Sequence, residues 1–142
     1  MTLTHDRRAE LLGACRLFEG LQQDDLAAIA ARAVEVDFGA RDVIARQGEI
    51  GTGFFVVAEG RVRVIRDGES VADLGPGEFF GELSVIDGAP RNAQVVAVEP
   101  THCLGIASWD FEAILIEQPR VALAVLRAVV ARLRRAAHDE RH

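Results

Sequence analysis

The sequence predicts a mainly β domain with helices at both ends, and three observations support this prediction. Between about residues 34 and 107, hydrophobic residues occur in short runs, several of which alternate with polar residues as in half-buried β-strands. Turn signals containing glycine separate these runs at regular intervals, which is typical of a sandwich or a barrel. On both sides of this region, hydrophobic residues recur at helical spacing instead.

Two helical stretches are expected at the N-terminal end, over about residues 8–30. The first begins near Arg8 and is expected to end at Gly13. The second is expected to be capped by Asp24 or Asp25, because a carboxylate at a helix start accepts hydrogen bonds from free backbone N–H groups. Its hydrophobic residues are Leu26, Ile29 and Ala30.

The central region, about residues 34–107, divides into short strands. Its first run alternates Val34, Val36 and Phe38 with acidic residues, whereas 54–57 is continuously apolar and 62–65 mixes hydrophobic residues with an arginine. The turn signals between the strands are Gly39, Gly48, Gly60, Asp67-Gly68 and Gly75-Pro76-Gly77.

Two helices are expected at the C-terminal end, over about residues 109–137. Ser108 is expected to cap the first, and Pro119 to restart the second, since proline is tolerated in a first helical turn. Residues 121–130 carry a single charge, so the second helix must be covered on more than one side. A heptad-like stripe could meet a second subunit, although an ordinary core helix is an equal alternative; the stripe is Leu126, Val130, Leu133 and Ala137.

The composition bounds the class of protein. The 142 residues predict one domain spanning 1–142, with 49% hydrophobic and 27% charged residues as in a globular protein. A net charge of −6 argues against non-specific nucleic-acid binding, which needs a basic surface. No signal peptide or membrane-spanning run is evident, and Cys15 and Cys103 are interpreted as buried free thiols. We therefore expect a cytoplasmic protein that binds neither nucleic acid nor membrane.

Enzymatic chemistry has little support in the sequence. The four histidines are scattered, the two cysteines have no partners at metal-binding spacing, and no phosphate-binding GxxxxGK[ST] loop occurs. We expect a binding protein with no catalytic residues and no metal.

Residues 77–98, GEFFGELSVIDGAPRNAQVVAV, carry the most specific chemistry. The N–H groups of Glu82, Leu83 and Ser84 lie at a predicted helix start, and Gly81 lets a ligand approach the backbone closely. Arg91 offers a fork of charged donors that suits two oxygens of a phosphate. Glu82 would repel that phosphate unless a neutral donor, such as a ribose 2′-hydroxyl, lay between them. A phosphate beside a sugar hydroxyl describes a nucleotide.

This segment resembles the phosphate-binding cassette of the cyclic-nucleotide-binding domain family, which includes catabolite activators and protein kinase A regulatory subunits. The matching elements are Phe80-Gly81-Glu82-Leu83-Ser84 and Pro90-Arg91-Asn92-Ala93, with a second similar stretch upstream at 48–64. The resemblance covers about residues 17–137. It implies an eight-stranded jelly-roll barrel, a double-stranded β-helix, with N-terminal helices and a C-terminal helix that acts as a lid or dimer contact.

The resemblance also implies roles for these residues. Glu82 would bind the ribose 2′-hydroxyl, Arg91 the cyclic phosphate, and the amides of Leu83 and Ser84 would complete the phosphate cradle. The C-terminal helix would contact the base through Arg132 and Leu133. Asn92 stands where many relatives carry Ser, Thr or Ala, so the choice between cyclic AMP and cyclic GMP stays open, with cyclic AMP in first place.

The expected function is therefore a cyclic-nucleotide sensor. Its sequence ends where catabolite activators continue with a winged helix-turn-helix, so we expect a stand-alone domain that signals to a separate effector protein through the C-terminal helix, as a monomer or a homodimer. The alternative is a ligand-free jelly roll used for dimerisation or for docking to an effector.

Overall fold

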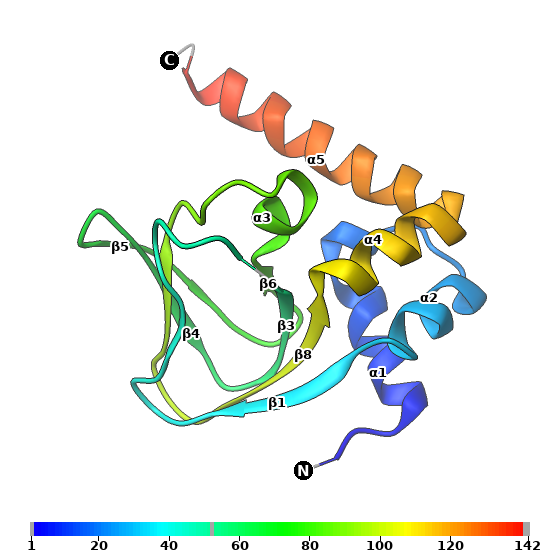
Figure 1. Ribbon diagram of the computed structural model, residues 1–142, viewed down its shortest axis with the longest axis horizontal. Coiled ribbons are helices and arrows are strands. Elements are labelled where there is room, and N and C mark those ends of the chain that lie inside the picture. The colour runs from blue at the N-terminus through cyan, green and yellow to red at the C-terminus, as the bar shows by residue number, and fades with distance from the viewer. Residues whose placement is uncertain (1, 52, 141–142) are drawn as a thin grey trace.

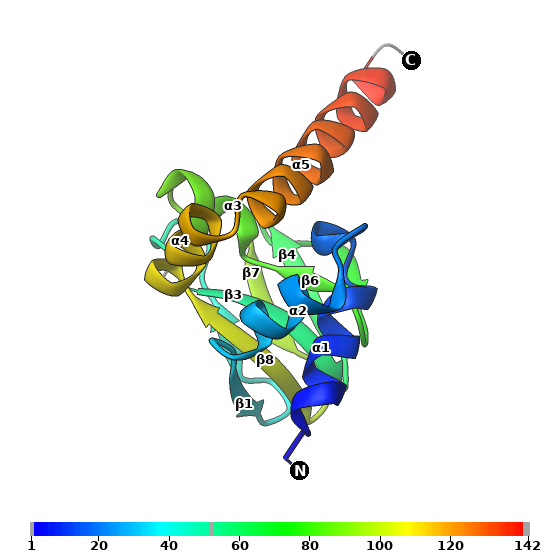
Figure 2. The same cartoon turned by 90° about the vertical axis from the view of Figure 1, so that its right-hand side faces the viewer.

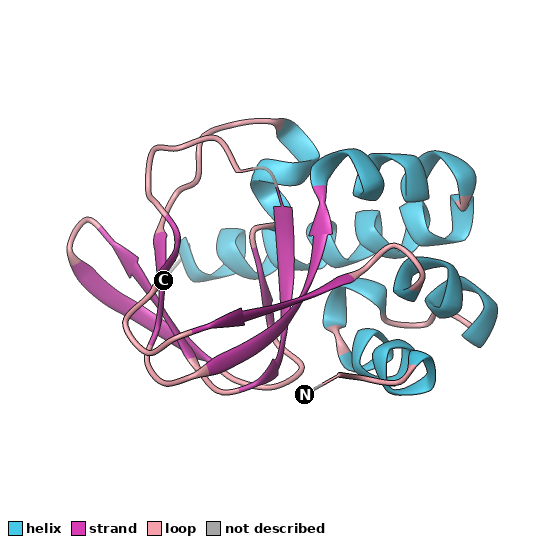
Figure 3. Ribbon diagram, turned by 60° about the horizontal axis from the view of Figure 1, so that its bottom comes forward, coloured by secondary structure: helices cyan, strands magenta, loops and turns pink. Residues whose placement is uncertain are grey.

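In the described part of the chain, eight strands form two antiparallel sheets, and helices flank one of them (Figure 1, Figure 3). The computed structural model describes residues 2–51 and 53–140. The first sheet has the order β1 (Val34–Phe38), β8 (Thr101–Ala107), β3 (Gly53–Glu59), β6 (Phe79–Phe80). The second has the order β2 (Val43–Ala45), β7 (Gln94–Ala97), β4 (Val62–Arg66), β5 (Glu69–Leu74). The predicted class and the eight strands are confirmed.

The predicted jelly-roll barrel is not closed in the structure. Among the strands of residues 2–51 and 53–140, every pairing lies within one of the two sheets, so the sheets face each other without joining at their edges. The physical reason is visible at β6, which is only two residues long. Gly81 then adopts φ 91°, turns the chain out of the sheet, and leads directly into a helix. The edge strand therefore offers few backbone groups for a ladder of hydrogen bonds with the opposite sheet.

The helices are placed close to where the sequence predicts them. At the N-terminal end lie α1 (His5–Ala14), the 3₁₀ turn η1 (Arg16–Phe18) and α2 (Gln23–Ala30). The short α3 (Glu82–Asp87) interrupts the strands, and α4 (Ser108–Glu117) and α5 (Pro119–Glu140) follow them. As the proline predicts, α5 starts at Pro119.

The predicted helix ends and caps differ from the structure. Thr4 caps α1 by accepting a hydrogen bond from the Arg7 amide, and Gly13 lies inside that helix. Ser108 is the first residue of α4, with Ala107 before it, and provides no side-chain cap. At α2 the residue in the cap position is Gln22, which makes no side-chain cap hydrogen bond. Caps depend on the exact first residue of a helix, which periodicity locates only approximately.

Asp25, proposed as a cap, instead anchors α5. Its side chain is 1% exposed and accepts hydrogen bonds from Arg120 at 3.1 Å. The carboxylate lies in the first turn of α2, 95 residues before its arginine partner in the sequence but adjacent to it in space. Pairing satisfies a carboxylate that would otherwise be buried alone.

Strand β3 is buried on both faces, which explains its continuous apolar run. On one face, Phe54 and Val56 pack against the helices, where Phe54 meets the rings of Phe18 at 5.9 Å and Phe111 at 5.5 Å. On the other face, Val57 belongs to the core between the two sheets. The first sheet is thus the middle layer between the helices and the second sheet.

Within the part of the chain that the structure describes, no helix is both long enough and apolar enough to cross a membrane.

A charged cluster joins the N-terminal segment to the first sheet. His102 of β8 is buried, with Nδ1 2.5 Å from Asp37 and Nε2 2.7 Å from Glu35. Glu35 also accepts hydrogen bonds from Arg8 and from the Leu3 amide, both at 2.9 Å. Arg8 first, and then Leu3 and His102, lower the pKa of Glu35 to about 2. Burial disfavours the charged form of His102, but its two carboxylate partners outweigh this and raise its pKa.

This cluster predicts a loss of stability at alkaline pH. A histidine whose pKa is raised by folding stabilises the folded state fully below its ordinary value of 6.5, and that contribution disappears as pH rises through the folded value. We expect the free energy of unfolding to fall above pH 6.5 in the parent, whereas His102→Asn should be less stable by about 1–3 kcal/mol at pH 6 and lack this fall. Urea unfolding at several pH values measures both, with the exposed His5→Asn as the control. An identical pH profile in the His102 variant would contradict this assignment.

Candidate functional site

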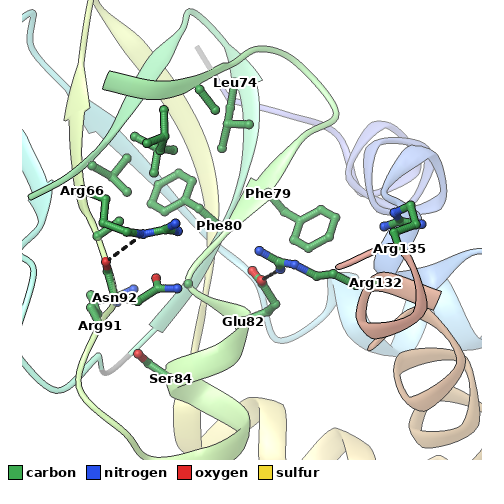
Figure 4. A pocket seen from close by; sticks show the side chains of 16 residues that line it. Arg66, Leu74, Phe79, Phe80, Glu82, Ser84, Arg91, Asn92, Arg132 and Arg135 are labelled. Atoms are coloured by element: carbon green, nitrogen blue, oxygen red, sulfur yellow. Dashed lines mark hydrogen bonds and ion pairs between the residues drawn. The ribbon is translucent and has the colours of Figure 1, made fainter. Parts of the chain in front are cut away.

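A cavity of about 330 Å³ lies between the second sheet, the β6–α3 turn and α5 (Figure 4). One part of its wall is apolar and comes mainly from strands of both sheets: Val64, Val71, Ala72, Leu74, Phe79, Phe80, Ala93 and Val95. The other part is polar and mostly cationic: Arg66, Gly81, Glu82, Ser84, Arg91, Asn92, Arg132 and Arg135. Glu82 is the single carboxylate in this wall as described, so the cavity combines an apolar surface with an excess of hydrogen-bond donors.

Gly81 is required at the turn between β6 and α3. It adopts φ 91°, a conformation that other residues reach only with strain. A Cβ built there would lie 2.8 Å from the Gly53 carbonyl oxygen and 2.8 Å from Arg91 Nη1. The missing side chain thus leaves space for the guanidinium. The first backbone hydrogen bond of α3 runs from Val85 to the Gly81 carbonyl, so the Leu83 and Ser84 amides lie before it in the first turn.

Arg91 is held in place by backbone rather than by an acid. Its Nη2 donates to the Gly53 carbonyl at 2.9 Å, and its Cζ would lie 2.6 Å from a Cβ on Gly51. Its own amide donates to the Glu49 carbonyl at 2.7 Å. Burial lowers the pKa of Arg91, and the nearby Glu82 acts in the opposite direction. A half-buried guanidinium with donors to spare is a fitting partner for an anion.

Glu82 is a buried carboxylate that contacts the C-terminal helix. Its residue is 5% exposed, and its Oε1 accepts a hydrogen bond from Arg132 Nη1 of α5. Figure 4 shows the two side chains pointing toward one another across the cavity. This contact joins residues that are fifty positions apart in the sequence.

Arg66 and Asn92 form the opposite side of the cavity. Arg66 Nε donates to the carbonyl oxygen of Asn92 at 3.3 Å, so the loop before β7 is tied to β4 (Figure 4). Asn92 is exposed, whereas the neighbouring Ala93 is buried.

The structure brings most of the predicted site residues together. Those that line the cavity are Phe80, Gly81, Glu82, Ser84, Arg91, Asn92, Ala93 and Arg132. Pro90 instead forms an isolated bridge with Ile50, and Leu133 is 63% exposed on α5; neither lines the cavity. The Leu83 backbone lies in the first turn of α3, and its side chain lies outside the described part of the structure.

Four further residues contribute that the sequence did not single out. Gly51 and Gly53 make room for Arg91 and bind it, and Arg66 and Arg135 line the cavity. The two glycines directly before the apolar run of β3 were a usable signal, because glycine in or beside a strand often marks a close approach of another group. Nothing local distinguishes Arg66 or Arg135 from other surface arginines.

Metal and thiol chemistry find no support over the described ranges, 2–51 and 53–140. No group of three His, Cys, Asp or Glu residues is arranged there so that it could hold a metal ion. Cys15 and Cys103 are free and buried, and burial raises the pKa of each thiol to about 12. Such thiols are poor nucleophiles at neutral pH.

Comparison with known proteins identifies the family. The model of the cyclic nucleotide-binding domain matches residues 35–118, more than half of the chain. The chain belongs to the cyclic nucleotide-binding domain family, as its cassette motif indicates.

Individual relatives agree with this assignment. The chain is 39% identical over 95 residues to the cyclic AMP receptor protein of Thermus thermophilus, covering 63% of this chain and 44% of that protein. It is 36% identical over 128 residues to a cyclic nucleotide-gated potassium channel of Rhizobium etli, covering 89% of this chain and 35% of the channel. The chain thus spans less than half the length of either relative.

A solved structure of similar extent also matches. It is the N-terminal domain of a transcriptional regulator from Streptomyces coelicolor, with a TM-score of 0.81 and 34% identity over 92% of this chain and 94% of that one.

Two glycine substitutions separate the strain of the Gly81 turn from its contact with Arg91. Gly88 also has a positive φ, 69°, but a Cβ there would meet nothing within 4 Å. Gly88→Ala should therefore cost only the conformational strain, about 1–2 kcal/mol. Gly81→Ala should cost clearly more, because its Cβ also displaces Arg91 or the Gly53 carbonyl. Urea unfolding of both variants measures the difference, and equal losses of stability would contradict this close approach.

Proposed function

We propose that this chain is a sensor that binds cyclic AMP in the cavity of Figure 4 and passes occupancy to an effector protein through α5. The observation that carries the proposal is that two side chains lie in the wall of one cavity: the Arg91 guanidinium, bound to a backbone carbonyl, and the buried Glu82 carboxylate. Arg91 and Glu82 occupy the positions of the family cassette, and both line this cavity.

The two residues divide the chemistry of the ligand. Arg91 uses Nη2 on the Gly53 carbonyl and has four other N–H donors, enough for two oxygens of a cyclic phosphate. Glu82 would accept a hydrogen bond from the ribose 2′-hydroxyl, a neutral donor that lies between the carboxylate and the phosphate. The amides of Leu83 and Ser84 are proposed as further phosphate donors.

The apolar wall is proposed to hold the purine base. It is built from strand residues such as Val64, Leu74 and Val95, which offer contact area without directional hydrogen bonds. Arg132 is proposed to reach the ligand from α5. Cyclic AMP is the first ligand to test, because the Thermus relative is named a cyclic AMP receptor protein, and cyclic GMP is the second.

The C-terminal helix offers a surface for a second copy of the chain. Its inner residues Val121, Ala124 and Val125 are buried, whereas an outer stripe is 39–63% exposed. That stripe contains Leu126, Val130 and Leu133 of the predicted stripe, together with Leu123, which precedes them at the same heptad spacing. The last predicted member, Ala137, is also exposed. The inner face is thus that of an ordinary core helix, while the outer stripe is exposed. We propose a homodimer along the stripe, because a heptad stripe is complementary to another copy of itself.

The proposal describes a binding protein without catalysis, located in the cytoplasm. Its support is the non-catalytic chemistry of the cavity and the two free, buried thiols, which suit a reducing compartment.

Ligand binding is tested by calorimetric titration with cyclic AMP, cyclic GMP and 2′-deoxy cyclic AMP. Arg91→Gln should lose about 2–5 kcal/mol of binding free energy, roughly 30-fold or more in affinity, because the phosphate loses its buried charged partner. Glu82→Gln should lose less, and its preference for cyclic AMP over the deoxy analogue should shrink. The control is Arg63→Gln, which removes the same charge from an exposed pair with Asp73.

Two results would count against this function. A parent protein that binds none of the three nucleotides would favour the ligand-free interaction module. Unchanged affinity in both cassette variants would place the ligand elsewhere.

The dimer is tested by sedimentation velocity over a range of concentrations. The parent should form dimers as concentration rises, and Leu126→Glu should stay monomeric, because it places a charge in the middle of the stripe. Ile116→Glu is the control, since Ile116 is 73% exposed on α4, outside the stripe. A parent that is monomeric at every concentration would remove the dimer from the proposal.

A further inference from the structure

We propose that Arg132 is a positioning residue for the ligand, which acts through Glu82 and thereby makes the position of α5 depend on the same carboxylate that binds the ribose. This inference rests on the proposed function and deepens it, because it names the contact by which the helix senses occupancy.

The two halves of α5 are attached to the protein in different ways. The first half is packed into the core through Val121 and Val125 and tied to α2 by the Arg120–Asp25 pair. In the second half, all residues from 131 to 137 are exposed. Figure 2 shows this half extending away from the helices below it. Among the residues described, its hydrogen bond to the body of the protein is the one from Arg132 to Glu82.

The contact differs from an ordinary surface ion pair because its acidic side is buried. Exposed pairs contribute little, since both partners are well solvated when apart. Here the Arg132 side chain is 52% exposed, but that of Glu82 is only 7% exposed. Without a cation, Glu82 would be a buried carboxylate with little solvation, a state that proteins avoid. Arg132 therefore gives this buried carboxylate a charged hydrogen-bond partner and holds its side chain in one orientation.

A ribose hydroxyl cannot take over this task, because it brings no charge. A carboxylate has two oxygens and can accept several hydrogen bonds, so Arg132 on Oε1 leaves acceptor capacity for the ligand. We therefore expect ligand and helix to share Glu82 rather than to compete for it. Because Arg132 holds the carboxylate in place for the hydroxyl, each contact stabilises the other, and this coupling is equal in both directions.

The experiment uses the full chain and three substitutions on α5. Arg132→Gln removes the charge, Arg132→Lys restores it, and Arg134→Gln removes an equal charge from an exposed neighbour that does not line the cavity. The first measurement is amide hydrogen exchange over residues 130–137 without nucleotide. The second is the ratio of the dissociation constants for 2′-deoxy cyclic AMP and cyclic AMP.

We expect Arg132→Gln to speed exchange in this half of α5 and to reduce the ratio at least about five-fold, because an unanchored Glu82 no longer selects the hydroxyl. Arg132→Lys should recover most of both effects, and Arg134→Gln should match the parent. A merely structural arginine would change exchange but leave the ratio intact.

The outcomes separate this inference from the function on which it rests. If the parent binds neither nucleotide, the proposed function fails together with the ligand role of Arg132, while faster exchange in Arg132→Gln would still establish the anchor of α5. If the parent binds and discriminates but Arg132→Gln discriminates equally well, the function stands and the positioning role is overturned. Unchanged exchange in Arg132→Gln would overturn the anchor.

Discussion

The double-sided burial of β3 is the constraint on which the rest of the structure depends. Phe54 faces the helices and Val57 faces the second sheet, so this strand joins the two hydrophobic cores. Burying side chains of this size contributes about 1.5–3 kcal/mol each, more than an exposed ion pair such as Arg63–Asp73 provides. The same strand begins at Gly53, whose carbonyl binds Arg91. The cation of the site is therefore attached to a strand that is buried on both faces.

The two key residues of the site are supported in different ways, and this difference has consequences. Arg91 is held by the Gly53 carbonyl and by the space that Gly51 and Gly81 leave for it, all of which are features of the backbone. Glu82 is held by Arg132, which lies on the exposed half of α5. One side of the cavity is thus preformed, while the other depends on where a helix lies. Such an asymmetry suits a sensor, because only the second side has to respond.

Much of the fold followed from the sequence because its signals are local. Alternating hydrophobic and acidic residues predicted β1. The cassette motif predicted that Gly81 and Arg91 belong to one site, and both line the cavity. The errors concern features that depend on distant partners or on single positions. Asp25 looks like a helix cap, yet it is buried against Arg120, and the barrel stays open because Gly81 ends β6 after two residues. The expected base contact through Arg132 and Leu133 stays a prediction: Arg132 lines the cavity, whereas Leu133 is 63% exposed and does not.

Two proposed contacts of α5 lie within one helical turn: the contact of the outer stripe with a second copy, and the contact of Arg132 with Glu82. Val130 and Leu133 belong to the outer stripe, whereas Arg132 lies between them in sequence and turns toward Glu82. Successive residues point about 100° apart around a helix, so Arg132 lies next to Leu133 but nearly opposite Val130, and both faces belong to the same helix. A small rotation or tilt of this half of α5 must therefore alter both. If a second copy packs on the stripe, it will sense the state of Glu82 without touching the ligand, and coupling of 1–3 kcal/mol, typical between linked sites, would be enough for a signal.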